Sequence, residues 1–240
     1  MGIFRFKQFS IQQDQSAMKV GMDGVLLGAW ANAKTATSIL DIGTGTALLA
    51  LMLAQRNINA YIHAVEIDDL AYEEACINVA QSPWANRVTI AHKPIQDYAL
   101  DAQQYSLIVS NPPFFGRNST LAEGKQRQTA RSTNTLTHTK LLAIAQKLLI
   151  PGQGVFCLIL PIVEGEKVLE EAPKYNLYLH KLTKVIPREG KEANRLLIEF
   201  RNTKTAEPIV NELVCRNPGN TYHDYTQEYI ELCKAFYLKM

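Results

Sequence analysis

The chain has 240 residues, is 47% hydrophobic and carries a formal net charge of +2 at pH 7, which fits one globular domain with a sizeable core. It has no uncharged apolar run long enough to span a membrane, and its first ten residues lack the apolar stretch of a secretory signal, so we expect a cytoplasmic protein. The four cysteines are widely spaced without a Cys-x-x-Cys pair, which argues against a disulfide framework or a zinc site and predicts no bound metal.

The amino-terminal region leaves two interpretations open. Phe4, Phe6 and Phe9 are interspersed with basic residues. This set either stacks on nucleotides or forms a small strand that packs on the core. Asp23 lies just before the apolar run 25–30, where its default role is to cap a helix.

A strand, a glycine-rich turn and a helix then follow one another. Residues 38–41 are a short apolar strand, 42–46 form the turn, and 47–56 have a helical pattern. Glycines in such a turn let a ligand approach the backbone, as in nucleotide-binding units. Leu48 stands where a dinucleotide fingerprint requires a third glycine, and Asp41 would repel a pyrophosphate. An acid there suits a cationic ligand with an amino acid tail, such as S-adenosylmethionine; the alternative is an ordinary tight turn.

Carboxylates follow the next two expected strands. The strand 60–65 ends in Glu66, about 20 residues after the glycine turn, where a carboxylate can accept both hydroxyls of a ribose. The acidic pair 68–69 suits the cap and first turn of the following helix. After the strand 87–92, Asp97 either accepts a hydrogen bond from the cofactor's adenine amino group or is a solvated loop acid.

The most informative motif is Asn111-Pro112-Pro113-Phe114, which ends the apolar strand 105–110. The prolines stop the strand and stiffen the turn. The Asn111 side-chain oxygen and the Pro112 carbonyl can each accept one N–H of an exocyclic amino group, and Phe114 can stack on the base. This set predicts a site that holds and activates an adenine amino nitrogen; the alternative is a proline-rich turn that merely ends a strand.

The remaining pattern continues the alternation of helices and strands. We predict helices over 136–150 and 166–173, and strands over 155–160, 181–187 and 195–200. Such alternation indicates a doubly wound α/β fold. The last two strands are expected to form the antiparallel edge of a mostly parallel, seven-stranded sheet. Ligands bind such sheets at the carboxyl ends of the strands, where the three motifs above fall.

These motifs, in this order and spacing, resemble class I S-adenosylmethionine-dependent methyltransferases of the amino-methylating type. Further segments resemble the bacterial valine-tRNA adenine-37 N6-methyltransferases, namely 6–9, 17–21, 23–24, 27–30, 81–84 and 235–238. The resemblance covers essentially the whole chain. One departure is Pro94, where the family commonly carries an acidic residue, and whether Asp97 takes over its contact with the adenine is open.

The resemblance implies a single Rossmann-like methyltransferase domain over 1–240, with a lid or target-side segment at 1–35 and a catalytic core at 36–240. It implies S-adenosylmethionine as cofactor, tRNA as partner and a monomeric enzyme. The expected catalytic residues are Asn111, Pro112, Pro113 and Phe114. The expected cofactor-binding residues are Asp41, Gly43, Thr44, Gly45, Glu66, Ile67, Ile95, Asp97 and Asn111, and the expected substrate-binding residues are Lys19, Phe114, Phe115, Arg117 and Arg131.

The distribution of charge favours RNA as the substrate. Residues 117–147 contain six basic residues and one acid, and residues 181–204 contain seven basic residues and three acids. Basic flanks of this kind supply phosphate contacts. Two rival functions remain: methylation of a glutamine amide in a protein, which requires a similar turn, and a non-catalytic RNA-binding module that has kept the cofactor fold.

Overall fold

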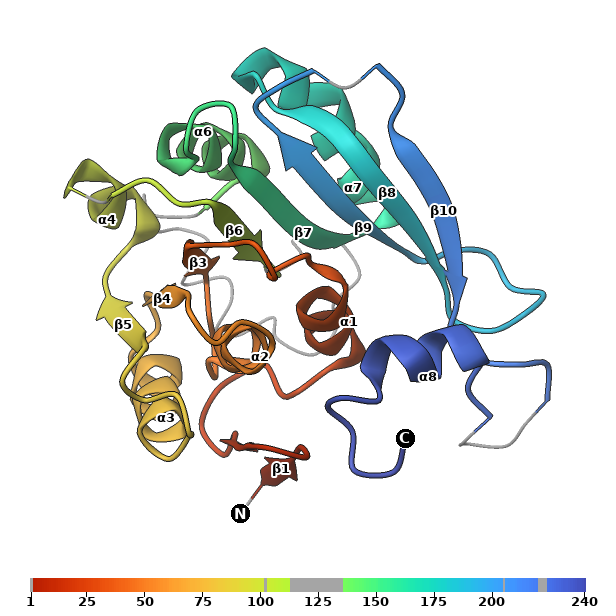
Figure 1. Cartoon of the computed structure of the whole chain (residues 1–240), viewed down its shortest axis with the longest axis horizontal. Helices are drawn as coiled ribbons and strands as arrows, with labels where there is room; N and C mark the ends of the chain where they lie inside the picture. Colours follow the sequence, from red (N-terminus) through yellow and green to blue (C-terminus); the bar gives the residue numbers. More distant parts are fainter. Residues whose placement is uncertain (1, 102, 113–135, 205, 220–223) are drawn as a thin grey trace.

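The structure, a computed structural model, describes residues 2–101, 103–112, 136–204, 206–219 and 224–240. Its centre is a sheet of eight strands in the order β10-β8-β9-β7-β6-β3-β4-β5 (Figure 1). The bounds are β3 Ser38–Ile42, β4 Tyr61–Glu66, β5 Val88–His92, β6 Leu107–Ser110, β7 Val155–Pro161, β8 Tyr178–Ile186, β9 Arg195–Arg201 and β10 Ile209–Val214. The predicted α/β fold class is confirmed.

Two details of the sheet differ from the prediction. The sheet has eight strands rather than seven, because the chain adds β10, an edge strand with four exposed residues out of six. The antiparallel strand is not at the edge: β9 lies between β7 and β8 and runs against both, whereas β10 pairs with β8 in parallel. The carboxyl ends of β8 and β10 therefore lie at the same edge of the sheet as those of β3, β4 and β6.

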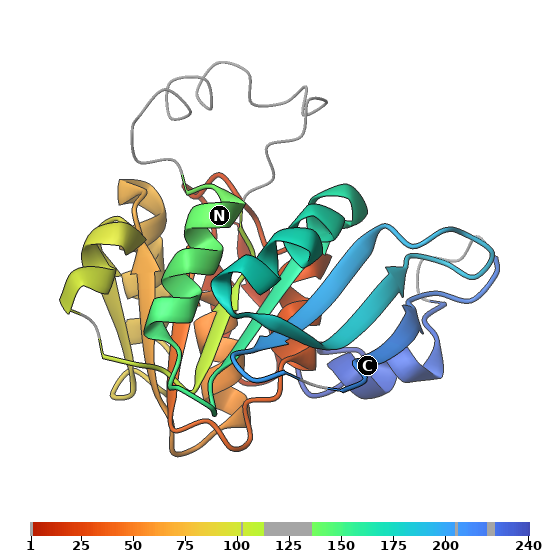
Figure 2. The same cartoon turned by 90° about the horizontal axis from the view of Figure 1, so that it is seen from above.

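Helices cover both faces of the sheet, as parallel strands require. One face carries α1 (Met22–Trp30), α2 (Leu48–Arg56), α3 (Asp69–Ala80) and α8 (Gln227–Cys233). The other carries α4 (Ile95–Asp101), α6 (His138–Leu148), α7 (Ile162–Glu171) and the 3-10 turn η1 (Ala172–Tyr175). Figure 2 shows α4, α6 and α7 in front of the strands. The sheet thus separates two hydrophobic cores.

Helix α1 lies unusually close to α2. A Cβ atom on Gly28 would come within 2.7 Å of the Met52 sulfur, and one on Gly24 would come within 2.9 Å of a Leu48 methyl group. These two glycines are one helical turn apart and lie on one side of α1. They bring the first turn of α1 against the start of α2, beside the glycine-rich turn that precedes it.

The two ends of the chain pack together. The strands β1 (Ile3–Arg5) and β2 (Ser10–Gln12) form a hairpin. Its connecting turn contains Phe6 and Phe9, whose rings stack 4.6 Å apart and are buried. Phe6 forms a bridge with Tyr237, and the Lys7 amide donates to the Phe236 carbonyl at 2.8 Å. Because Phe6 and Phe9 are buried, they fit the interpretation that this segment packs on the core, and not the one in which their rings stack on nucleotides.

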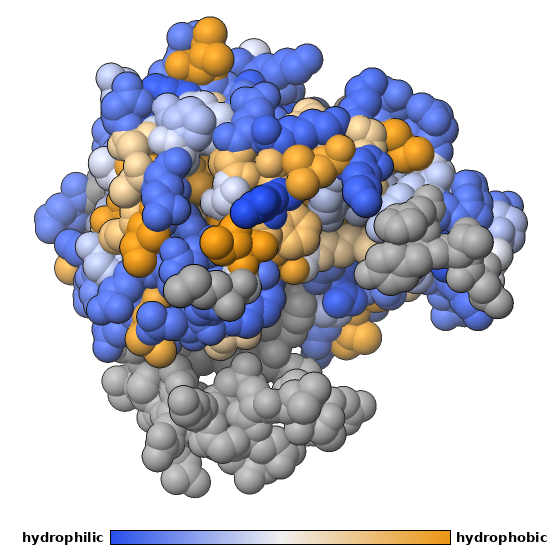
Figure 3. Space-filling view, turned by 90° about the horizontal axis from the view of Figure 1, so that it is seen from below, coloured by the Kyte–Doolittle hydropathy of each residue, from blue (hydrophilic) through white to orange (hydrophobic). Residues whose placement is uncertain are grey.

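The surface on this side of the molecule is mixed. Figure 3, seen from below Figure 1, shows orange apolar groups interrupted by blue hydrophilic side chains. Within the described ranges, no helix combines the length and apolar content needed to cross a lipid bilayer. The four cysteines are free thiols, and Cys157, Cys215 and Cys233 are buried.

Candidate functional site

The ends of three neighbouring strands bring the predicted motifs together. In the sheet, β6, β3 and β4 are adjacent, and Ile42 pairs with Ser110 on one side and with Val65 on the other. The next residue on each strand is Asn111, Gly43 or Glu66. Because neighbouring strands lie about 4.8 Å apart, these three positions are side by side at the carboxyl edge. Their predicted meeting at one edge is confirmed, whereas their roles stay predictions.

The glycine-rich turn leaves room above its backbone. The amides of Gly43 and Thr44 both donate to the Val65 carbonyl, at 2.9 and 3.1 Å, which folds the turn over the end of β4. Gly43 and Gly45 have φ of 71° and 57°, a conformation that glycine adopts without strain. A Cβ atom on either would meet no described atom within 4 Å. The turn therefore offers open space and exposed backbone to a ligand.

Asp41 lies beneath this turn and is fully buried. One carboxylate oxygen, Oδ2, accepts from the Thr44 hydroxyl at 2.5 Å and from the Ala50 amide at 3.2 Å. The other, Oδ1, has no partner among the described residues. Burial raises the pKa of the Asp41 carboxyl to about 7, the two hydrogen bonds lower it, and the nearby Glu66 charge raises it slightly. A buried carboxyl with one unused oxygen is poised to accept a cationic donor.

The raised pKa of Asp41 makes the folded state less stable as pH rises. The ordinary pKa of 3.8 applies to the unfolded chain and about 7 to the folded chain, so the folded state binds more protons between these values and its stability falls as pH rises through this window. We expect Asp41→Asn to raise the free energy of unfolding by about 4 kcal/mol at pH 8, since the rise of the pKa from 3.8 to about 7 is worth about 1.4 kcal/mol per unit, and by much less at pH 4.5. Urea unfolding of both proteins at the two pH values tests this; an equal difference at both would exclude the raised pKa.

Glu66 is held by the backbone around it. Its Oε2 accepts from the Gly45 amide at 2.8 Å, and its Oε1 accepts from the amides of Ile67 and Asp68 at 2.7 and 2.9 Å. A carboxylate offers about four acceptor positions, so Oε2 keeps one for a ligand hydroxyl. The same bonds fix the orientation of the carboxylate toward the glycine-rich turn. Asp68 caps α3 by accepting from the Ala71 amide, as predicted.

Asn111 follows β6 with its side chain half-buried. Its Oδ1 is buried and has no hydrogen-bond partner among the described residues, a costly state unless a ligand supplies the donor. Its Nδ2 lies 3.9 Å from where a Cβ atom on Gly24 would be, so the first turn of α1 forms one wall beside it. Pro112 is buried. The predicted catalytic residues Pro113 and Phe114 lie outside the described residues.

The other predicted residues are placed as follows. Ile67 is exposed and Ile95 is buried, while Asp97 is exposed in the first turn of α4. The Lys19 ammonium donates to the backbone carbonyls of Gln13 and Asp14, which ties it to the amino-terminal segment. The predicted substrate-binding residues Phe115, Arg117 and Arg131 lie outside the described residues.

Two features near the site were missed or misassigned from the sequence. Asp23 is not a helix cap: the residue before α1 is Gly21, and Asp23 instead forms an ion pair with Arg195 of β9 at 2.8 Å. The closeness of Gly24 to Asn111 was also missed. Both depend on how α1 docks against the sheet, which no local pattern reveals, although the Gly24 and Gly28 spacing hints at close helix packing.

Comparisons with known proteins find methyltransferases. Residues 21–178 match the family model "Methyltransferase small domain". Proteins named tRNA1(Val) (adenine(37)-N6)-methyltransferase are similar over nearly the whole chain: that of Aeromonas salmonicida is 45% identical, with 99% of this chain and 98% of the relative covered. That of Phocaeicola vulgatus is 44% identical, with 99% and 98% covered, and that of Pectobacterium carotovorum is 43% identical, with 99% and 94% covered.

Solved structures support the fold. A predicted O-methyltransferase from Agrobacterium tumefaciens superposes with a TM-score of 0.65 at 17% identity, covering 89% of this chain and 96% of that one. A protein from Listeria monocytogenes, described as a candidate class I S-adenosylmethionine-dependent methyltransferase, gives 0.55 at 18% identity, covering 79% and 62%. At these identities the likeness shows a shared methyltransferase fold.

Proposed function

The chain belongs to the family of tRNA1(Val) (adenine(37)-N6)-methyltransferases, and from this premise we propose that its carboxyl-edge site transfers a methyl group from S-adenosylmethionine to N6 of adenine-37 in valine tRNA. One observation carries the proposal. The buried Oδ1 of Asn111 has no hydrogen-bond partner among the described residues, and it lies beside the open glycine-rich turn. One side of the site offers an acceptor for an amino group, and the other offers space for a cofactor.

The residues around the turn fit the cofactor. S-adenosylmethionine, when bound, supplies a methyl group that its positively charged sulfur makes electrophilic. Gly43 and Gly45 leave the space above the turn open. Asp41 has an Oδ1 available to accept from an ammonium group, and Glu66 has one acceptor position on its oriented Oε2 for a ribose hydroxyl. This donor set suits a ligand that joins a cationic amino acid to a nucleoside.

Asn111 and Pro112 would hold the target nitrogen. The lone pair of an adenine amino group is delocalised into the ring, which makes the nitrogen a poor nucleophile. If Asn111 Oδ1 and the Pro112 carbonyl each accept one of its N–H bonds, the nitrogen is fixed in place and favours a more tetrahedral form. Most of the rate acceleration then comes from positioning, and the proton leaves to solvent after the bond to carbon has formed.

The substrate and setting follow from the same premise. An adenine in an anticodon loop is already unpaired, so presenting it to the site costs little unstacking energy. We propose that the enzyme acts as a monomer in the cytoplasm, where tRNA is modified and its four thiols stay reduced. We also propose one domain over 1–240 with a target-side segment at 1–35. Since Val25, Leu26 and Leu27 of α1 are fully buried, any lid movement belongs to the residues before α1.

The product of the reaction tests this proposal. We expect purified protein with methyl-labelled S-adenosylmethionine to label tRNA from a strain lacking the enzyme, and digestion to nucleosides to place the label in N6-methyladenosine. Label recovered in glutamine of a protein would replace the RNA assignment with the protein one. Absence of S-adenosylmethionine binding by calorimetry would instead indicate a non-catalytic RNA-binding module.

A further inference from the structure

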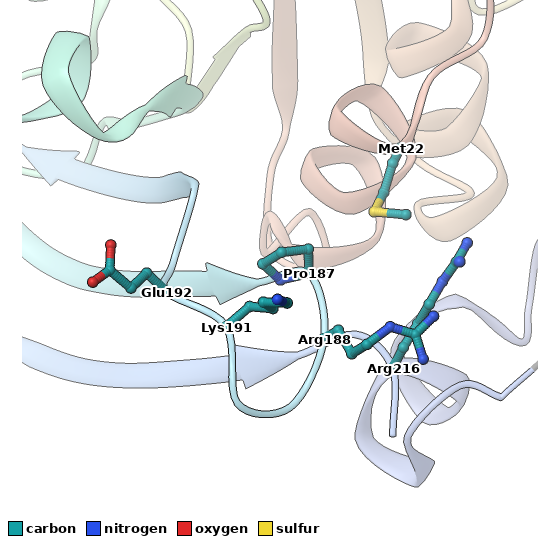
Figure 4. Close-up of a pocket in the computed structure, with 6 residues that line it drawn as sticks. All are labelled: Met22, Pro187, Arg188, Lys191, Glu192 and Arg216. Carbon is teal, nitrogen blue, oxygen red and sulfur yellow. The ribbon is translucent and has the colours of Figure 1, made fainter. Parts of the chain in front are cut away.

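A second, basic pocket lies further along the same edge of the sheet. It has a volume of about 650 Å³ and is lined by Met22, Pro187, Arg188, Lys191, Glu192 and Arg216. Figure 4 shows the side chains of Arg188 and Arg216 beside each other below Met22, while the Glu192 carboxylate points away from them. The pocket thus gathers three cationic side chains with one acid turned aside.

The position of the pocket follows from the sheet topology. Because β9 runs against both neighbours, β8 and β10 end at the edge where β3, β4 and β6 end. Arg188 follows the end of β8, and Arg216 follows the end of β10. Lys191 lies in the turn between β8 and β9. The reversal of one strand therefore places these cations in line with Gly43, Glu66 and Asn111.

The cations are held differently. The Arg188 guanidinium donates to the carbonyls of Asn217 (3.0 Å) and Gly219, and that of Arg216 lies over the Tyr225 ring, 5.2 Å from its centre. These contacts orient both guanidinium groups at the wall of the pocket. Lys191 is exposed, and no described residue forms an ion pair with it.

Helix α1 links the basic pocket to the target-amine site. Its cap, Gly21, provides no side-chain hydrogen bond, so the amides of the first turn keep their preference for an anion. Met22 in this turn lines the pocket, and Gly24, two residues later, lies beside Asn111. The acid of that turn, Asp23, is paired with Arg195. One helical turn therefore has the pocket at its start and Asn111 next to its third residue.

We propose that this basic pocket binds a backbone phosphate of the tRNA close to the adenosine that is methylated. The proposal rests on the proposed function, since it concerns how the substrate of that site is held. Cationic side chains and a helix amino terminus recognise phosphate, and phosphate contacts fix the position of a nucleic acid without reading its sequence. A phosphate held at the start of α1 would fix the nucleotide chain within reach of Asn111.

The test removes the charge of Lys191 and Arg216 and measures tRNA methylation at saturating S-adenosylmethionine. We expect Lys191→Ala with Arg216→Gln to raise KM for tRNA about 10-fold, with kcat changed less than threefold. In a plot of log kcat/KM for tRNA against the logarithm of the salt concentration, the slope should be less steep by about 1 for each phosphate that the variant no longer neutralises. The single substitution Lys191→Glu, at an exposed turn position, should raise KM for tRNA and leave kcat unchanged. The matched control is Lys34→Ala, an exposed lysine in the loop before β3, at the opposite edge, which should leave KM unchanged.

The outcomes separate the two proposals. Wild-type protein that does not methylate tRNA would overturn the proposed function. Wild-type protein that methylates tRNA, together with a Lys191→Glu variant whose KM and salt slope match those of Lys34→Ala, would overturn the phosphate pocket alone. If inorganic phosphate inhibited the wild-type enzyme in competition with tRNA, but the variants kept the wild-type KM for tRNA, the pocket would bind a free anion. That result would also overturn the proposed tRNA phosphate site.

Discussion

Replacing Asn111 with Ala is expected to lower kcat for tRNA methylation by about 10²- to 10³-fold, the usual cost of losing one preorganised hydrogen-bonding group at a reacting centre. The Asn111 Oδ1 is buried without a described partner, so its acceptor capacity is available for the target amino group. Although Asn111 is also one of the expected cofactor-binding residues, the affinity for S-adenosylmethionine, measured by calorimetry, should fall far less than kcat does. Single-turnover kinetics at saturating tRNA would report the chemical step directly.

Asn202 provides a matched control for this substitution. Its Oδ1 is also buried without a described partner, and its Nδ2 donates to the Ile150 carbonyl at 2.9 Å. It follows the carboxyl end of β9, which lies at the opposite edge of the sheet. Asn202→Ala should therefore reduce stability and leave kcat unchanged. A similar kcat for Asn111→Ala and Asn202→Ala would remove Asn111 from the mechanism.

Replacing Glu66 with Gln is expected to weaken S-adenosylmethionine binding by about 10- to 100-fold. Hydrogen bonds to a charged group contribute about 1.5–3 kcal/mol, and each 1.4 kcal/mol is a factor of about ten in affinity. The amide keeps one acceptor oxygen for the backbone but loses the charge and the second acceptor. The expected result is a raised dissociation constant in calorimetry, with kcat at saturating cofactor close to that of the wild type.

Glu199 serves as the control carboxylate. It is buried, and its Oε1 accepts from Arg201 at 2.9 Å, on β9 and away from the glycine-rich turn. Glu199→Gln should leave cofactor affinity unchanged even if it lowers the melting temperature. If Glu66→Gln bound S-adenosylmethionine as tightly as Glu199→Gln does, the ribose-binding role of Glu66 would be wrong.

The central fold was predictable because buried parallel strands are nearly continuous apolar runs. Strands β3, β4, β6 and β7 were expected within about two residues of their observed bounds. Strands β3, β4 and β6 end next to one another, since Ile42 pairs with both Val65 and Ser110. The site followed from the same rule, since strand ends at one edge bring Gly43, Glu66 and Asn111 together. For these elements, local pattern and tertiary environment agree.

The missed elements are those whose structure depends on distant partners. Strand β10 has four exposed residues out of six and becomes a strand by pairing with β8. Helix α4 follows Pro94 in a segment expected to be a turn, and α8 has seven residues, too few for a clear period. Helix α7 begins directly after Pro161, four residues before its predicted start, because the proline that ends β7 also precedes the first helical turn.

The contact between the two chain ends has a consequence for biosynthesis. The Lys7 ammonium donates to the carbonyls of Lys234 and Met240, so the hairpin of residues 3–12 contacts a segment that is translated long after it. During synthesis on the ribosome, the Phe6 ring stays uncovered until α8 and Tyr237 have emerged from the exit tunnel. A chain truncated before α8 would leave this aromatic surface exposed to chaperones and proteases, while the eight strands could already be in place.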